Sequence, residues 1–193
     1  TRNTIKLKVL AENILDISKI ESNSLKLNKQ NFSLDSLILD IVKEFGAKLG
    51  DENKEIKFEY SSSTDAYTLV YGDKNRIGQV MSNLIGNSIK FTNQKEGTIS
   101  INIRKGKKID NDKDSSVVVE IKDTGVGIDP EIFPKLFTKF ATKSFQGTGL
   151  GLYICKNIIE AHGGQIWAEN NINNSNKDGK KGATFSFSMP LKD

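Results

Sequence analysis

Apolar residues recur at helical spacing in four segments of the chain. The segments predicted as helices are residues 4–21, 33–49, 73–92 and 149–162. In the first helix the apolar residues alternate spacings of three and four, as in a seam between paired helices; they are Leu7, Leu10, Ile14 and Ile17. Ser33 and Asp73 are suitable N-caps for the second and third helices, and Gly163-Gly164 ends the fourth.

Short stretches rich in β-forming residues lie between and after these helices. The segments predicted as strands are residues 56–60, 68–71, 98–104, 117–122, 165–169 and 183–189. The pair 98–104 and 117–122 is expected to form an antiparallel hairpin, and residues 123–148 to be irregular. Because helices and strands mix without a strict alternation, we expect an α+β fold with helices on one face of a sheet. The seam helix should give way to the compact part near residues 28–32.

Length and composition fit one globular domain with a small appendage. The 193 residues only slightly exceed a typical domain of ~150, and 27% of them are charged, an ordinary share. The net charge of +4 is spread along the chain, so we interpret the basic residues as solvated loops and expect no nucleic-acid partner. No apolar run approaches the ~18 residues of a membrane span, so we expect no membrane contact.

The single cysteine and the single histidine are both interpreted as structural residues. Cys155 cannot form an internal disulfide, and its apolar helical surroundings indicate an inert core thiol. A lone cysteine also fits a reducing compartment, so we expect a cytoplasmic location. His162 lies where the last helix ends, which is typical of a capping or packing residue.

Two asparagines on the third helix are the first candidates for chemistry. Asn83 and Asn87 are four residues apart, so both project from one face, and Lys90 lies one turn further on. Amide oxygens suit Mg²⁺, and a lysine suits a phosphate. The alternative is a solvated helix face without a ligand.

An acidic residue followed by glycines is the second candidate. Asp123 ends a predicted strand and enters a turn with Gly125 and Gly127. A carboxylate only accepts hydrogen bonds, so it suits an exocyclic amine such as that of adenine and would repel a guanine carbonyl. Glycines let a flat ring approach the backbone. An ordinary Asp-Gly loop is the alternative.

The third candidate is the glycine-rich segment Gly147–Leu152, which leads directly into a helix. Backbone N–H groups at a helix start suit a phosphate, although the segment matches neither the dinucleotide fingerprint nor a Walker loop. Before it, Phe133, Phe137 and Phe140 recur at spacings of four and three, which also fits a short helix facing the core. Residues 141–148 are interpreted as a mobile lid.

The order of these segments resembles the ATP-binding catalytic domain of sensor histidine kinases, in the superfamily of gyrase, heat-shock chaperones and histidine kinases. The resemblance implies a two-layer sandwich of a mixed, mostly antiparallel sheet with helices on one face (the Bergerat-type fold) over residues 31–193. Residues 1–30 are similar to the second helix of the family's dimerisation hairpin. The matching boxes are Asp73–Thr92, Asp123–Ile128, Phe133–Phe140, Gly147–Leu152 and Gly182–Phe185.

The resemblance also implies a role for individual residues. Asn87 would hold Mg²⁺, Asp123 would accept from the adenine amino group, and Thr184 would sit behind the adenine. Asn83 and Lys90 are the implied catalytic residues. The implied nucleotide-binding residues are Asn83, Asn87, Lys90, Phe91, Asp123, Gly125, Gly127, Ile128, Lys143, Gly147, Thr148, Gly149, Leu150, Gly151 and Thr184.

The function implied by this resemblance is transfer of the γ-phosphoryl group of ATP to a histidine. Hydrolysing members carry Glu where this chain has Asn83, and an amide cannot take a proton at neutral pH, so hydrolysis should be slow. The helix with the acceptor histidine is expected to be missing, and His162 is not expected to replace it. Implied partners are ATP, the acceptor helix of a homodimeric parent that could be membrane-anchored, and a response regulator. A serine kinase or ATPase of the same superfamily and a non-catalytic nucleotide sensor are the alternatives.

Overall fold

A five-stranded sheet is the base of the fold. The computed structural model describes residues 2–51, 54–63, 68–93, 96–106, 116–142, 147–171 and 182–191. In sheet order the strands are β2 (Lys57–Ser62), β4 (Thr98–Lys105), β5 (Ser116–Asp123), β7 (Ala183–Pro190) and β6 (Ile166–Asn170). β2 lies parallel to β4 and the other neighbours are antiparallel, which confirms the predicted mixed, mostly antiparallel sheet.

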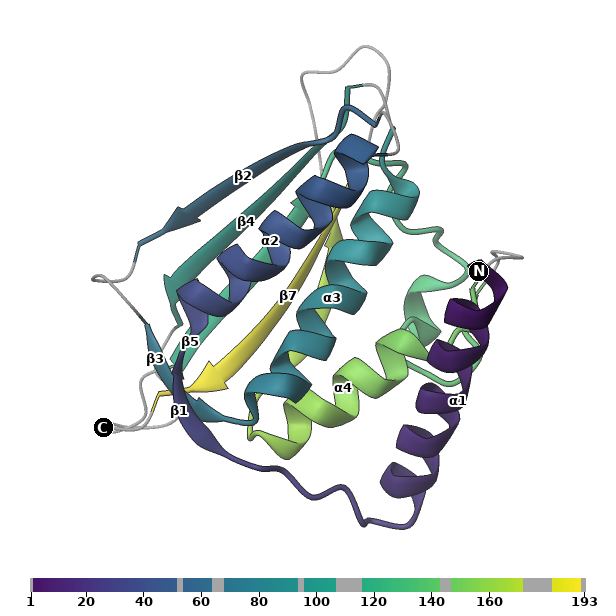
Figure 1. Ribbon diagram of the computed structural model, residues 1–193, viewed down its shortest axis with the longest axis vertical. Helices are drawn as coiled ribbons and strands as arrows, with labels where there is room; N and C mark the ends of the chain where they lie inside the picture. Colours follow the sequence, from purple (N-terminus) through teal and green to yellow (C-terminus); the bar gives the residue numbers. More distant parts are fainter. Residues whose placement is uncertain are drawn as a thin grey trace.

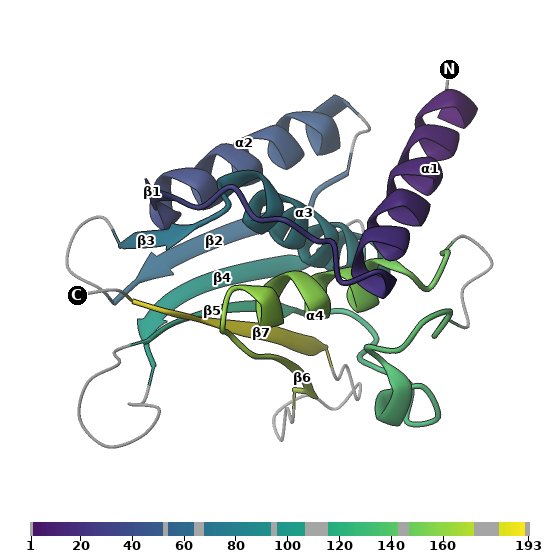
Figure 2. The same cartoon turned by 90° about the horizontal axis from the view of Figure 1, so that it is seen from below.

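Three helices cover one face of this sheet. They are α2 (Leu34–Asp51), α3 (Lys74–Phe91) and α4 (Gly151–Ala161), which lie in front of the strands in Figure 1 and on one side of them in Figure 2. The core between the layers is apolar, and each large side chain buried there stabilises the fold by ~1.5–3 kcal/mol. Its fully buried members include Ile38, Ile77, Met81, Leu84, Ile154 and Phe187.

The structure contains a second, two-stranded sheet, and the sequence predicts only one of its two strands. β3 (Leu69–Gly72) matches a predicted strand, but its antiparallel partner β1 (Gln30–Ser33) was not predicted. In β1 the first two residues are exposed, Phe32 is buried and Ser33 is partly buried, so the strand lacks a clear alternation of buried and exposed positions. The Ser33 hydroxyl accepts from the Ser36 N–H at 3.1 Å, which confirms the predicted cap of α2.

Asp73 joins three parts of the chain. Its Oδ1 accepts from the N–H groups of Asn75 and Arg76, which confirms it as the N-cap of α3. Its Oδ2 accepts from the Asn28 N–H at 2.9 Å, and its own N–H donates to His162 Nε2 at 2.9 Å. The linker before β1, the start of α3 and the end of α4 therefore meet at one residue.

The N-terminal helix α1 (Arg2–Glu21) packs on the side of the domain next to α4 (Figures 1 and 2). It uses a face that carries buried Asn13 and Asp16 and partly buried Ile17. Leu7 and Ile14 of the predicted seam are 66% and 56% exposed. The packed face is thus more polar than the predicted seam, and only part of that seam contributes to it.

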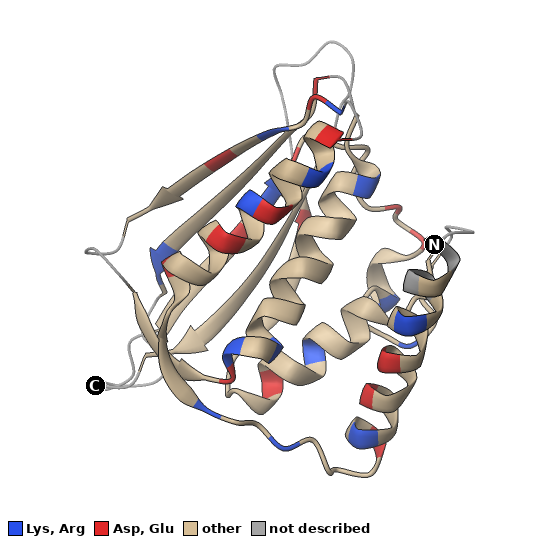
Figure 3. Ribbon diagram, in the orientation of Figure 1, with Lys and Arg blue, Asp and Glu red and all other residues tan. Residues whose placement is uncertain are grey.

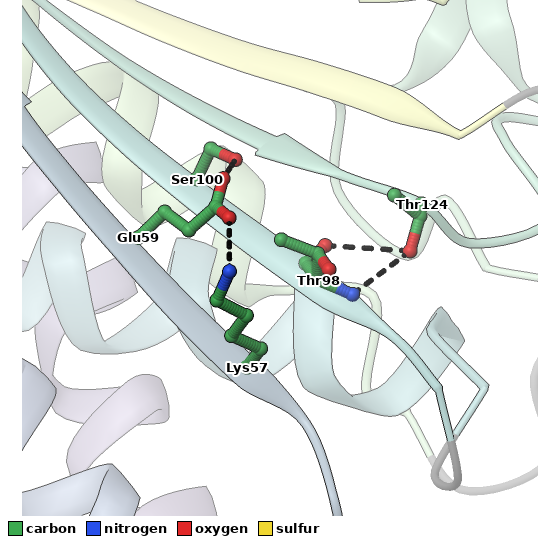
Figure 4. A network of polar contacts seen from close by, with 5 residues as sticks. All are labelled: Lys57, Glu59, Thr98, Ser100 and Thr124. Carbon is green, nitrogen blue, oxygen red and sulfur yellow. Dashed lines mark hydrogen bonds and ion pairs between the residues drawn. The ribbon is translucent and has the colours of Figure 1, made fainter.

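The other face of the sheet is polar. There Glu59 accepts from Lys57 at 2.8 Å and from Ser100 at 3.1 Å (Figure 4). At the end of β5, the Thr124 hydroxyl accepts from the Thr98 N–H at 2.9 Å and donates to the Thr98 carbonyl at 3.4 Å (Figure 4). The Thr124 N–H also donates to that carbonyl, at 3.2 Å. These bonds fix the turn that follows Asp123 against β4.

Charges are mixed over the described surface. Both α1 and α2 carry basic and acidic residues interspersed along their length (Figure 3). Within the described ranges, no helix is both long enough and apolar enough to cross a membrane.

Candidate functional site

A cavity of about 510 Å³ lies between α3, the turn after β5, the start of α4 and α1. This volume is in the range of ~300–1,000 Å³ that is usual for small-molecule sites. Most of the predicted site residues line it together. They are Asn83, Asn87, Lys90, Phe91, Asp123, Gly127, Ile128, Gly147, Thr148, Gly149 and Gly151.

Helix α3 supplies the polar wall of the cavity. Asn83 and Asn87 both line the cavity, as their spacing of four predicted, whereas Leu84 is buried in the core. Lys90 Nζ lies 5.1 Å from the centre of the Phe91 ring, which is 45% exposed. Among the described residues, no three His, Cys, Asp or Glu side chains are grouped to hold a metal. A single amide oxygen at Asn87 instead fits Mg²⁺, which keeps several waters and is usually shared with phosphates.

Asp123 is buried at the base of the cavity, with 3% exposure. Its Oδ1 accepts from the N–H groups of Gly125 at 2.9 Å and Ala183 at 3.1 Å, and within the described ranges no hydrogen bond occupies Oδ2, which can therefore accept from a ligand. Burial raises the pKa of this carboxyl, while the two N–H groups and the side chain of Ser88 oppose that rise. The site therefore pairs a buried acceptor with an apolar surrounding, as recognition of an amine on a flat ring requires.

Gly125 does not line the cavity but shapes it. A Cβ at this position would lie 2.5 Å from the Phe91 carbonyl oxygen, so only glycine fits. The neighbouring Val126 N–H donates to the same carbonyl at 3.3 Å. The end of α3 and the turn after β5 are thus held in close contact.

The start of α4 forms the part of the cavity wall next to Asn83. Gly149 has a φ of +68°, and a Cβ there would meet backbone atoms of Phe140 at 2.6–2.7 Å. A Cβ on Gly151 would lie 3.3 Å from Asn83 Oδ1, so α4 begins directly beside Asn83. The positive end of the helix dipole and the glycine backbone make this end suitable for an anion.

Two predicted binding residues lie elsewhere. Thr184 points to the polar sheet face, where its hydroxyl donates to Asn171 Oδ1 at 2.6 Å, and its neighbours Ala183 and Phe185 line the cavity instead. The expectation that Thr184 sits behind the adenine is therefore corrected, because side chains alternate along β7. The side chain of Leu150 is 4% exposed and belongs to the apolar core, so a role of Leu150 toward phosphates, which would use its backbone, stays a prediction. Lys143 lies outside the described residues.

The phenylalanine segment is only partly a core element. A short 3₁₀ helix spans Phe133–Lys135. Phe137 packs against the core, whereas Phe133 and Phe140 are 40% and 71% exposed. The alternative of a short helix facing the core therefore holds for Phe137 alone.

Sequence reasoning missed several lining residues. They are Val9, Asn13, Asp129, Ile132, Leu136, Ala141, Thr142, Leu152, Ala183 and Phe185. The alternation of apolar and hydroxyl residues over 183–189 could have identified Ala183 and Phe185. No comparable signal marked Val9 and Asn13, because the helical pattern of α1 shows only that it packs, not against what.

His162 and Cys155 are both buried structural residues. The Nδ1 of His162 lies 2.7 Å from the Ile158 carbonyl oxygen and its Nε2 accepts from Asp73, so both ring nitrogens are engaged. Burial lowers the pKa of His162 and raises the pKa of Cys155 to about 12, which keeps both groups uncharged near neutral pH.

Comparison with known proteins gives a consistent set of relatives. Residues 72–193 match the family model of the histidine kinase-, DNA gyrase B-, and HSP90-like ATPases. The hybrid signal transduction histidine kinase C of Dictyostelium discoideum is 34% identical over 190 residues, or 94% of this chain and 15% of that protein. The nucleotide-free catalytic domain of histidine kinase ThkA is 34% identical, with a TM-score of 0.67, over 86% of this chain and 96% of that one. ThkA in complex with the response regulator protein TrrA is 30% identical, with a TM-score of 0.67, over 97% of this chain and 50% of that one.

Proposed function

Because this chain belongs to the histidine kinase-, DNA gyrase B- and HSP90-like ATPase family and is an ATP-binding domain of the sensor histidine kinase type, we propose that it transfers the γ-phosphoryl group of ATP to a histidine. One observation carries the proposal. One cavity is lined by a buried carboxylate, two amides and a glycine-rich helix start. The chain spans 15% of the curated relative's length, so the proposal concerns the catalytic step of a larger system.

At the adenine end, Asp123 Oδ2 accepts a hydrogen bond from the amino group of the base. A guanine carbonyl in the same place would meet a carboxylate that cannot donate. Ile128 and the exposed ring of Phe91 provide apolar surface for the two faces of the base. The fixed hydrogen bonds of Asp123 Oδ1 keep the carboxylate in one orientation.

At the phosphate end, the residues position a triphosphate. Asn87 contributes an amide oxygen to Mg²⁺, which when bound neutralises phosphate charge, and Lys90 supplies a point charge. The glycine backbone from 147 to 151 donates N–H groups as it closes on the phosphates. A role for Lys143 in reaching the phosphates stays a prediction.

Asn83 favours transfer over hydrolysis. Its amide cannot act as a general base for water, while phosphoryl transfer depends mainly on positioning and charge stabilisation. The acceptor lies outside these 193 residues, because the only histidine, His162, is buried with both nitrogens engaged. By analogy with the complex of ThkA and TrrA, we expect a response regulator to receive the phosphoryl group from the acceptor histidine. We also expect α1 to belong to a dimerisation hairpin that carries this histidine.

The test is phosphotransfer in trans. The chain is incubated with Mg²⁺, γ-labelled ATP and a separate helical-hairpin dimer that carries the acceptor histidine. We expect acid-labile label on the hairpin, none on this chain, and loss of labelling in an Asp123→Ala variant. ATP binding without phosphohistidine would indicate a nucleotide sensor, and rapid phosphate release or acid-stable phosphoserine would indicate another member of the superfamily.

A further inference from the structure

Asn13 of α1 is a buried polar residue in the wall of the cavity. It is 9% exposed and lines the same cavity as Asn83 and Gly149. Among the described residues, none donates to or accepts from its side-chain amide. In the described part of the chain, the buried side-chain atoms without a partner are the hydroxyls of Ser88 and Thr92, so the amide of Asn13 is not sealed in the core but keeps access to the cavity that it lines. The amide of Asn13 is therefore placed to meet a polar ligand in the cavity.

The position of Asn13 is fixed by an ion pair one turn away. Asp16, which is 6% exposed, accepts from Arg76 Nη1 and from Gln79 Nε2, each at 2.8 Å. Arg76 also donates to Gln79 Oε1 at 2.8 Å, so the three side chains form a closed network. At the end of α1, Glu21 pairs with Lys139. These contacts hold α1 in register along α3 and α4.

This register places Asn13 beside the Asn83 part of the cavity and not beside Asp123. Ser88 of α3 lies close enough to Asp123 to lower the pKa of its carboxyl, and Asn83 lies five residues before Ser88, about 7.5 Å along the helix at 1.5 Å per residue. Helices α1 and α3 run in opposite directions (Figure 1), and Gln79, the partner of Asp16, is one turn before Asn83. Asn13, about one turn before Asp16, therefore lies level with Asn83 and the start of α4.

We infer that Asn13 donates a hydrogen bond from its amide to the terminal phosphate of the bound nucleoside triphosphate, so that α1 is part of the nucleotide site. The inference rests on the proposed function, because it requires the base to occupy the Asp123 end. A diphosphate bound in the same way lacks the group that Asn13 contacts. Occupancy by a triphosphate thus holds α1 against the domain, and a diphosphate does not.

The test compares ATP and ADP affinities in the presence of Mg²⁺ by titration calorimetry. Asn13→Ala is expected to weaken ATP binding about tenfold, as for a hydrogen bond to a charged group, and to change ADP binding less than about twofold. Asn13→Asp, which keeps the shape and adds a negative charge, should weaken ATP binding further. Glu12→Gln is the matched control, since Glu12 is the exposed neighbour and both affinities should stay unchanged.

The outcomes separate this inference from the proposed function. Loss of selectivity for ATP in both Asn13 variants, with unchanged circular dichroism, supports it. An ATP affinity of Asn13→Ala within twofold of the parent chain overturns it, and so does an equal loss for ATP and ADP. In either case the parent chain still binds ATP, and the proposed function stands. A parent chain that binds neither nucleotide overturns both.

Discussion

Replacing Asp123 with Asn changes the adenine end of the cavity with little change in shape. The new side chain can still accept from the N–H groups of Gly125 and Ala183 through its Oδ1. In place of Oδ2, however, it presents an amide NH₂ to the amino group of the base. Asp123→Asn therefore removes an acceptor and sets two donors against each other.

The expected loss of ATP affinity is large. A hydrogen bond to a charged group contributes ~1.5–3 kcal/mol, and a buried donor without a partner costs ~1–3 kcal/mol more. A combined loss of roughly 3 kcal/mol corresponds to about 150-fold weaker binding. GTP binding should not weaken, because the new amide can donate to the guanine carbonyl.

Stability should not fall with affinity. Burial raises the pKa of Asp123, so its contribution to the free energy of unfolding is present at acid pH and is lost as the pH rises through that raised pKa. A neutral amide avoids burying the charge, so the variant should be at least as stable as the parent chain at pH 7. Urea unfolding measures this directly.

The assay is calorimetric titration of both chains with ATP and GTP at pH 7. Asp129→Asn is the matched control, because Asp129 lines the same cavity but is exposed. We expect the control to bind ATP within about threefold of the parent chain. A folded Asp123→Asn chain that does the same would refute the assignment of Asp123 to the base.

Three other predictions concern the framework of the site. Gly125→Ala should lower the free energy of unfolding by ~1–3 kcal/mol, because its Cβ would meet the Phe91 carbonyl. Gly86→Ala, inside α3, should raise the free energy of unfolding by ~0.5–1 kcal/mol, because its Cβ would meet nothing within 4 Å. Urea titration of both variants tests this pair of expectations. Burial lowers the pKa of His162, so the contribution of this residue to the free energy of unfolding is lost as the pH falls through that lowered pKa. The decrease in the free energy of unfolding from pH 7 to pH 5 should therefore be larger in the parent chain than in His162→Gln. Equal decreases would contradict this. Asp16→Asn removes the charge that pairs with Arg76 and should weaken the docking of α1 by ~1–3 kcal/mol. The expected readout is faster amide hydrogen exchange in α1 with unchanged exchange in the sheet. Faster exchange in both α1 and the sheet would instead mean global destabilisation.

Most elements of the fold could be predicted because their signals are local. Helix α3 has both a cap at Asp73 and a regular apolar face, and it begins and ends within a residue of the prediction. β1 has neither signal: its four residues form a strand only because β3 lies beside them. Tertiary pairing of this kind leaves no mark on a short polar segment.

The site could be predicted where motifs are compact, and not where it depends on direction or docking. Asp123 and the two asparagines line one cavity as expected. Thr184 lies on the polar face of the sheet, as the alternation of hydroxyl and apolar residues along β7 requires, whereas the motif that contains it carries no information on the direction of its side chain. Asn13 could not be found in advance, because its place in the cavity depends on the ion pair between Asp16 and Arg76.

The bond between Asn28 and Asp73 sets how far α1 can travel. If α1 leaves its docking site, the chain stays anchored at residue 28, and the six residues from 22 to 27 form the linker between the helix and this anchor. At ~3.3–3.6 Å per residue, this linker spans about 20 Å when fully extended. The released helix therefore remains at a local concentration on the order of millimolar beside the domain, and redocking is a frequent intramolecular event that does not depend on protein concentration.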